Sequence, residues 1–140
     1  METKGKAEAV DLAMARAGAW QDRFPAPLEF RVADTALADP DLPGAENGDV
    51  YNASATYACP ASPRRAHTVL RALHSAWSSR GWESALRRSP HGGGVTAQDP
   101  EGFTYSLETW TAPAVLVLHV YSPLYRDPDP DTLFTPRRPG

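Results

Sequence analysis

The clearest pattern in the chain is a strict alternation of two residue classes between Val50 and Cys59. One set is apolar and the other is polar: Tyr51, Ala53, Ala55, Tyr57 and Cys59 against Asn52, Ser54 and Thr56. Successive side chains of a β-strand point to opposite faces of the sheet. A period of two therefore predicts a strand that turns one face toward the core.

Four further segments show the same period after Gly81: residues 82–88, 95–98, 103–110 and 114–121. The connections between them are short, which predicts antiparallel neighbours. Residues 114–120 are nearly continuously apolar, so we expect them to form a central strand that is buried on both faces, either by a cover on each side or by a partner.

Two segments have helical spacing instead. The first, residues 6–23, is alanine-rich and places Val10, Ala13, Met14, Ala17 and Trp20 on one side. The second lies between Ser62, which predicts an N-cap followed by Pro63 in the first turn, and Gly81, which predicts a left-handed stop. Its apolar stripe comprises Ala66, Val69, Leu70, Leu73 and Trp77.

The remaining segments contain mainly turn signals. Residues 33–48 carry Asp-Pro, Pro-Gly and Asn-Gly dipeptides, which predict a surface loop, and residues 126–140 form a proline-rich, extended tail. We therefore expect an α+β fold in which two helices pack on a mostly antiparallel sheet of about five strands. The predicted order is α-β-α-β-β-β-β, with a single domain over residues 1–125.

The charge and hydropathy of the chain exclude some classes of partner. The chain of 140 residues has a net charge of −3, and its arginines are scattered, so no nucleic-acid partner is expected. No segment approaches the roughly 18 apolar residues of a membrane span, and the N-terminus lacks the apolar core of an export signal. We expect a soluble chain. Its compartment stays open: cytoplasmic, or lipid-anchored outside the cytoplasm if an export signal was removed.

Several motifs point to chemistry only superficially. His-Gly-Gly-Gly at residues 91–94 matches the oxyanion loop of some hydrolases, but the chain has no Gly-x-Ser-x-Gly, and we interpret the glycines as a flexible hairpin. His67 and His74 lie about two helical turns apart, roughly 10 Å, which is too far for one ion. The Asp-Pro-Asp-Pro-Asp run at 127–131 lacks the glycine and glutamate of a calcium loop. No metal and no cofactor are expected.

No catalytic constellation is evident in the sequence. His119 on the apolar strand is a candidate for a pocket or acid-base residue, and Cys59, the only cysteine, is predicted to be a buried thiol rather than a nucleophile activated by His67. Because Cys59 is single, the chain has no internal disulfide, whereas pairing between chains stays open. Nothing in the spacing of Glu83, Glu101 and Glu108 singles out a carboxylate pair.

The aromatic residues point to binding instead. Two helices leave one face of a sheet uncovered, and three aromatic residues of the last strands, Trp110, Tyr121 and Tyr125, are candidates for a binding surface there. Together with His119 they form the predicted binding set.

The stretch from residue 50 to 125 also shares a sequence of features with a known group. A helix ends in a Trp-rich glycine turn (Trp77, Gly81, Trp82), a strand pair closes on Asp-x-x-Gly-Phe (99–103), and an apolar strand ends in Ser122-Pro123. This half of the chain resembles the C-terminal domains of small actinobacterial lipoproteins of uncharacterised function. In that group a cysteine often follows Ser-Pro and an upstream cysteine would match Cys59, but here the position is Leu124. The resemblance implies an envelope location and no catalytic residues.

Three functions follow in order of preference. The first is a non-catalytic domain that binds a protein or a small ligand through its sheet, as an envelope-associated accessory protein. The second is a cytosolic immunity or antitoxin-type inhibitor, which suits a small acidic domain. The third is a small enzyme that uses His119 or Cys59. The oligomeric state and the identity of the partner stay open.

Overall fold

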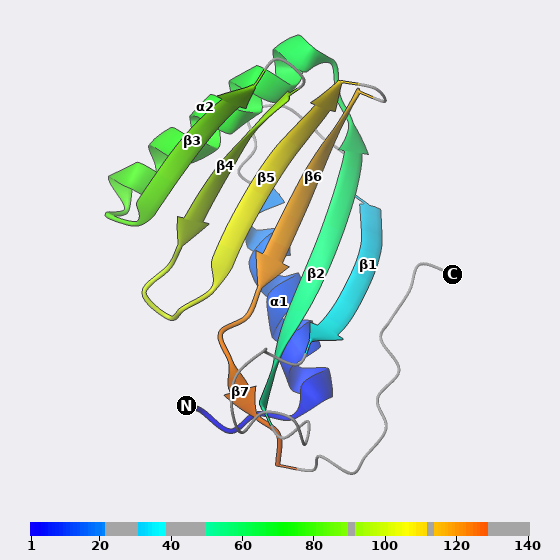
Figure 1. Ribbon diagram of the computed structural model, residues 1–140, viewed down its shortest axis with the longest axis vertical. Coiled ribbons are helices and arrows are strands. Elements are labelled where there is room, and N and C mark those ends of the chain that lie inside the picture. Colours follow the sequence, from blue (N-terminus) through cyan, green and yellow to red (C-terminus); the bar gives the residue numbers. More distant parts are fainter. Residues whose placement is uncertain (22–30, 39–49, 90–91, 112–113, 129–140) are drawn as a thin grey trace.

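A computed structural model of the chain describes residues 1–21, 31–38, 50–89, 92–111 and 114–128. Its elements follow the chain as α1 (Lys6–Gln21), β1 (Arg31–Ala38), β2 (Val50–Pro60), α2 (Pro63–Ser79), β3 (Glu83–Ser89), β4 (Gly92–Gln98), β5 (Thr104–Thr111), β6 (Ala114–Tyr121) and β7 (Tyr125–Arg126). Six strands form one antiparallel sheet in the order β1-β2-β6-β5-β4-β3, and the short β7 pairs with the start of β2 (Figure 1). The predicted α+β class with two helices on an antiparallel sheet is confirmed.

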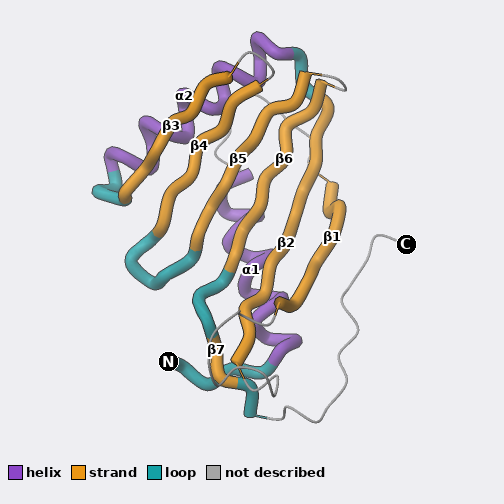
Figure 2. Tube along the Cα trace, viewed as in Figure 1, coloured by secondary structure: helices purple, strands orange, loops and turns teal. Residues whose placement is uncertain are grey.

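Both helices lie on the same side of the sheet (Figure 2). The core between the two layers is built from the alternate residues of each strand that face the helices, such as Leu107, Leu116 and Leu118. An aromatic cluster fills its wider part: Trp20 of α1 packs edge-on against Trp77 of α2, and Tyr105 of β5 stacks on the ring of Trp82. Rings in these orientations attract each other in addition to the apolar area that they bury.

The start and stop signals of α2 act as predicted. The hydroxyl of Ser62 accepts a hydrogen bond from the backbone N–H of Arg65, Pro63 occupies the first turn, and Gly81 has a φ of 79°. All five residues of the predicted apolar stripe are buried. Local capping and the helical period were sufficient to define this element because each depends on neighbours within one or two turns.

The surface loop predicted for residues 33–48 is wrong over its first part, since residues 33–38 belong to β1. This strand pairs along most of its length with β2, and Thr35, which lies opposite Ala55, is buried. Its alanine-rich sequence has a low intrinsic preference for strands, so the pairing with the edge of β2 decides its conformation. Residues 39–49 lie outside the described part of the chain.

The glycine run was also predicted wrongly, because Gly92, Gly93 and Gly94 belong to β4 rather than to a turn. They pair with β3 on one side and with β5 on the other. At Gly94 a Cβ atom would lie 3.3 Å from Nη2 of Arg87 and 3.4 Å from the carbonyl oxygen of Leu107. The missing side chain therefore lets Arg87 lie across the strand, and His91 lies outside the described residues.

The apolar strand β6 is central, as predicted, but among the described residues only one of its faces is covered by helices, which leaves the predicted alternative of a partner on the other face. From Val115 to Val120 its residues alternate between half-buried and buried, and the buried ones, Leu116, Leu118 and Val120, face the helices. Val115 and Val117 face the other side of the sheet, where no described helix packs. A continuous apolar run thus marks a strand with two apolar faces, and it does not show how many of them are covered.

The predicted tail contributes to the folded domain at its beginning. Arg126 of β7 exchanges backbone hydrogen bonds with the N-terminal segment, accepting from Lys4 and donating to Glu2. Asp127 is buried, and its carboxylate lies 3.1 Å from the ammonium group of Lys6. Residues 129–140 lie outside the described part of the chain.

A buried carboxylate organises the turn between β4 and β5. Oδ1 of Asp99 accepts hydrogen bonds from the backbone N–H groups of Glu101 and Phe103, and Oδ2 accepts one from the hydroxyl of Tyr105 at 2.9 Å. Arg16 of α1 reaches the same turn, with Nη1 3.8 Å from Oδ2 of Asp99 and an ion pair to Glu101. One side chain therefore fixes the turn and attaches the first helix to it.

We expect Asp99→Ala to lower the free energy of unfolding by about 2–4 kcal/mol, because three donors, two of them buried, lose their acceptor. Chemical denaturation followed by circular dichroism measures this change. Glu101→Gln is the matched control: it removes a charge from the same turn but leaves these three hydrogen bonds in place. Equal, small losses in both variants would contradict the assigned role of Asp99.

The buried tyrosines make the fold sensitive to alkaline pH. Burial, and next the hydrogen bond to Asp99, raise the pKa of Tyr105 above its ordinary value. Burial also raises the pKa of Tyr51, Tyr57 and Tyr125. In the unfolded chain these phenols ionise at about pH 10, whereas in the folded chain they stay neutral to higher pH. Their contribution to stability is therefore complete below about pH 10 and decreases above it.

We predict that the melting temperature falls as the pH rises from about 9.5 to 11.5. Thermal unfolding across this range, with tyrosinate absorbance recorded in parallel, measures the effect. Tyrosinate absorbance that develops fully near pH 10 without any unfolding would contradict the shifted pKa values.

Candidate functional site

The sheet surface opposite the helices, called here the open face, is formed by the alternate residues of β2 to β6 that point away from the core. The register aligns them in rows across the strands. One row runs Thr56, His119, Ser106, Thr96 and Ala85, and the next runs Ala58, Val117, Glu108, Gly94 and Arg87. Three of the four predicted binding residues, Trp110, His119 and Tyr121, share this face.

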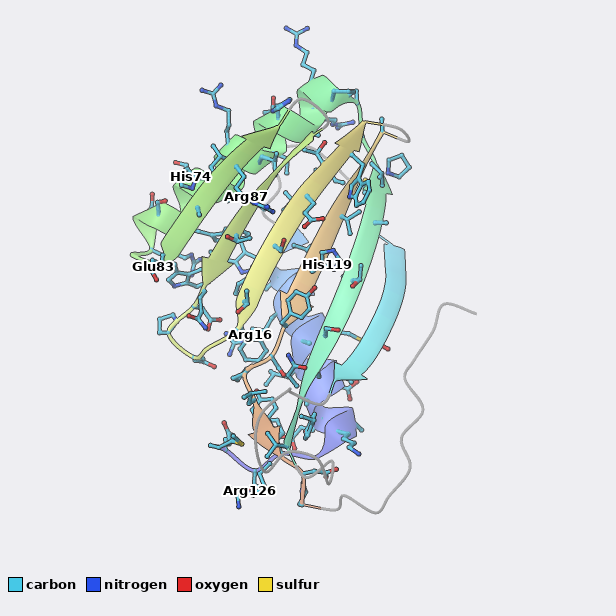
Figure 3. All side chains as sticks on the ribbon, viewed as in Figure 1. Arg16, His74, Glu83, Arg87, His119 and Arg126 are labelled. Atoms are coloured by element: carbon cyan, nitrogen blue, oxygen red, sulfur yellow. The ribbon has the colours of Figure 1, made fainter. Side chains whose placement is uncertain are left out.

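His119 lies near the middle of the sheet (Figure 3). Its Nδ1 atom is 3.0 Å from the hydroxyl oxygen of Thr56 on the neighbouring strand, and its ring stacks on Tyr121 with a centroid distance of 5.9 Å. Ser106 lies opposite it on the other side. The imidazole is therefore held in a defined orientation by a hydroxyl group and an aromatic ring, an arrangement that suits a hydrogen-bonding contact to a ligand.

The open face is apolar toward one end of β5 and β6. Trp110 is 53% exposed and lies opposite the half-buried Val115, and Val117 follows on the same face. At the other end Tyr121 is 37% exposed and lies opposite Thr104. Trp110 and Tyr121 are the large aromatic residues classed as exposed among the described residues. Exposed aromatic side chains of this size are typical anchors of binding surfaces.

An ion pair crosses the open face toward its margin. Nη2 of Arg87 on β3 lies 4.0 Å from Oε1 of Glu108 on β5, above Gly94 of the strand between them. A shallow hollow of about 480 Å³ lies over the beginning of β3 and β5 and the end of β4, and its lining comprises Glu83, Ser84, Ala85, Thr96, Ala97, Gln98 and Thr104. Its walls offer hydroxyl, amide and carboxylate groups. Such a hollow can take a polar side chain of a partner.

Tyr125 does not lie on the open face. It is 2% exposed and packs in a small second core with Tyr51, where the two ring centroids are 6.0 Å apart. The ammonium group of Lys4 lies 5.4 Å from its ring. The prediction that Tyr125 lies with Trp110 and Tyr121 on the uncovered face is therefore wrong, because β7 pairs with the start of β2 and places Tyr125 opposite Tyr51.

The two residues considered for nucleophilic catalysis, Cys59 and His67, do not form a common site. Cys59 is buried and its thiol donates to the carbonyl of Pro60, whereas His67 is exposed on α2. His74 does form a contact that the sequence did not indicate: its Nδ1 is 2.8 Å from the hydroxyl oxygen of Ser84. Within the described ranges no group of three or more His, Cys, Asp and Glu side chains comes together to hold a metal ion.

Comparison with known proteins does not assign the chain to a family. No protein-family model matches the chain, and neither a curated protein nor a solved structure is significantly similar to it. Among the described helices, none is long and apolar enough to cross a membrane. The functional proposal therefore rests on the open face itself.

We expect Thr56→Val to change the tautomer balance of His119, because the ring loses the hydroxyl that fixes one nitrogen. The ¹⁵N chemical shifts of the imidazole, measured by NMR at a pH where the ring is neutral, report the change. Thr56→Ser keeps the hydroxyl and should keep the shifts of the wild-type chain. Identical nitrogen shifts in Thr56→Val and the wild type would show that the Thr56 contact does not orient the ring.

Proposed function

We propose that the chain is a non-catalytic binding domain that takes a partner protein on its open face. One observation carries this proposal: Trp110 and Tyr121 are exposed on the sheet face that neither helix covers, with the half-buried Val117 and His119 between their rows. Large aromatic residues exposed on a sheet face are typical anchors of protein interfaces, and this supports a binding role for the open face.

The dimensions of the face favour a protein over a small ligand. The rows of Trp110 and Tyr121 are separated by six residues of β6, which corresponds to about 20 Å along a strand. Small molecules are usually enclosed in a deep pocket, whereas the hollow on this face is shallow and open. An apolar end with Trp110, next to hydroxyl groups and the Arg87–Glu108 pair, has the mixed character of a protein interface.

The resemblance of residues 50–125 to actinobacterial lipoprotein domains supports an envelope-associated accessory role for this binding. A role as an immunity-type inhibitor requires the same kind of surface with a toxin as the partner. The identity of the bound protein decides between the two: a component of the cell envelope supports the first, and a toxin enzyme supports the second.

We expect Trp110→Ala and Tyr121→Ala each to weaken binding of that partner by about tenfold or more, since large aromatic residues dominate interface energies. The wild-type chain immobilised on beads captures proteins from a lysate of the source cells, and quantitative mass spectrometry compares this capture with that of each variant. The affinity for the recovered protein is then measured by titration calorimetry.

Arg71→Ala is the matched control, because Arg71 is exposed on the outer side of α2, away from the sheet. It should bind the partner like the wild type. A partner that is lost with Arg71→Ala and retained with both open-face variants would place the binding surface on the helices and contradict the proposal.

A further inference from the structure

The sheet ends at β3, and among the described residues no strand pairs with its outer margin. Figure 1 shows β3 at the edge of the sheet, next to β4 only. An edge strand presents unpaired backbone N–H and C=O groups to its surroundings, and these groups form a template for a further strand. The side chains of β3 decide which strand fits there.

The hydrogen bonds of the neighbouring strands show which backbone groups of β3 are available. The backbone N–H of Asp99 donates to the carbonyl of Phe103, just beyond the facing ends of β4 and β5. Hydrogen-bonded pairs alternate along an antiparallel ladder, so Val95 bonds to Leu107, whereas Thr96 turns its backbone groups toward β3, where it lies opposite Ala85. Ala85 therefore turns its backbone groups toward β4, whereas those of Ser84 and Leu86 face outward and can receive a new strand.

The side chains at this margin are complementary to themselves. Glu83 and Arg87 are exposed on the open face and flank Ala85, which is also exposed (Figure 3). When β3 meets an antiparallel copy of itself centred on Ala85, Glu83 lies opposite Arg87 of the second copy, and this pair occurs twice. A register centred on Leu86 places Arg87 opposite alanine, and one centred on Arg87 places two arginines face to face.

We propose that two copies of this chain associate through β3, pairing antiparallel about Ala85 with two Glu83–Arg87 contacts across the junction. Opposite charges directly across an antiparallel pair stabilise it, and like charges destabilise it, so the charges select this register over its neighbours. Because Ala85 is the central residue and has a small side chain, the two backbones approach without obstruction on this face.

The existing ion pair fits this arrangement. Arg87 already extends over Gly94 toward Glu108 of its own chain. A guanidinium group carries five N–H donors, so it can bind Glu108 on one side and Glu83 of the second copy on the other. The row of charges then continues from one sheet into the next.

The dimer axis runs perpendicular to the sheet, because a two-fold axis at an antiparallel edge keeps each face on its own side. Both open faces therefore point in the same direction, and the two six-stranded sheets form one continuous surface. A partner with two binding sites gains avidity from such a surface. The association itself does not depend on what the open face binds.

Charge reversal tests the pairing. Light scattering after size exclusion, from micromolar to millimolar protein, should show a dimer for the wild type. Glu83→Arg and Arg87→Glu should each raise the dissociation constant by about tenfold or more, because each turns both attractive pairs into repulsive ones. An equimolar mixture of the two variants should restore the dimer, since each arginine then meets a glutamate.

Both variants keep a net negative charge, because the chain carries −3 and each substitution changes the charge by two. General attraction between oppositely charged chains therefore does not explain recovery in the mixture. Arg126→Glu is the matched control: it reverses an exposed charge on β7, far from β3, and should leave the dimer intact.

A cysteine at the dimer axis tests the register directly in a Cys59→Ala background. Residues opposite each other in a pair without backbone hydrogen bonds have Cα atoms about 4.5 Å apart, which suits a disulfide. Ala85→Cys should therefore form a disulfide-linked dimer under mild oxidation. Thr96→Cys, which lies opposite Ala85 but one strand further from the axis, should form no disulfide-linked dimer.

A wild-type chain that stays monomeric up to millimolar concentration would overturn the proposal. So would a dimer that survives both charge reversals, or equal cross-linking of the two cysteine variants, since each result places the contact elsewhere. Circular dichroism of every variant confirms that it folds before its oligomeric state is compared. Loss of the dimer leaves partner binding by a monomer measurable, so the two proposals fail independently.

Discussion

The packing of both helices against a single face of the sheet is the constraint from which the rest of the structure follows. A sheet of six strands has two faces, and two helices of 16 and 17 residues are enough to cover only one of them. Each central strand must therefore supply one row of apolar residues to the core and a second row to solvent. Leu107 and Leu118 belong to the first row, and Trp110 and Tyr121 belong to the second.

The two helices that cover the sheet are held in place by different kinds of contact. α2 is continuous with the sheet through its caps and the turn at Gly81, so its position follows from local sequence. α1 is remote in sequence from the strands that it covers. Arg16 connects it to the turn organised by Asp99, and Trp20 inserts into the aromatic cluster against Trp77. Polar and aromatic contacts thus supplement an alanine-rich helix whose small side chains bury little area each.

The uncovered face of the sheet and the unpaired edge of β3 have the same origin, because the described helices and strands are too few to cover both. The face exposes Trp110 and Tyr121 on either side of His119, whose ring is held by the hydroxyl of Thr56. The margin at β3 exposes backbone groups whose neighbouring charges alternate in sign. A protein that pairs at this margin enlarges its recognition surface without any change in the fold. Binding and self-association are therefore compatible uses of one sheet.

The sequence by itself determined the elements whose signals are local. The period of two gave β2 and β6 their strand character, and Ser62, Pro63 and Gly81 defined α2, because these preferences depend on residues within a turn or on alternate positions. The exposure of Trp110 and the orientation of His119 needed the tertiary structure, since both depend on which face the helices cover and on pairing with Thr56 across 63 positions of the chain. The same is true of β1 and of Gly92 to Gly94, which are strands only because neighbouring strands pair with them. The burial of Tyr125 also needed the tertiary structure. The sequence predicted this residue on the surface, but the fold brings its ring against Tyr51, which lies on a strand distant in sequence.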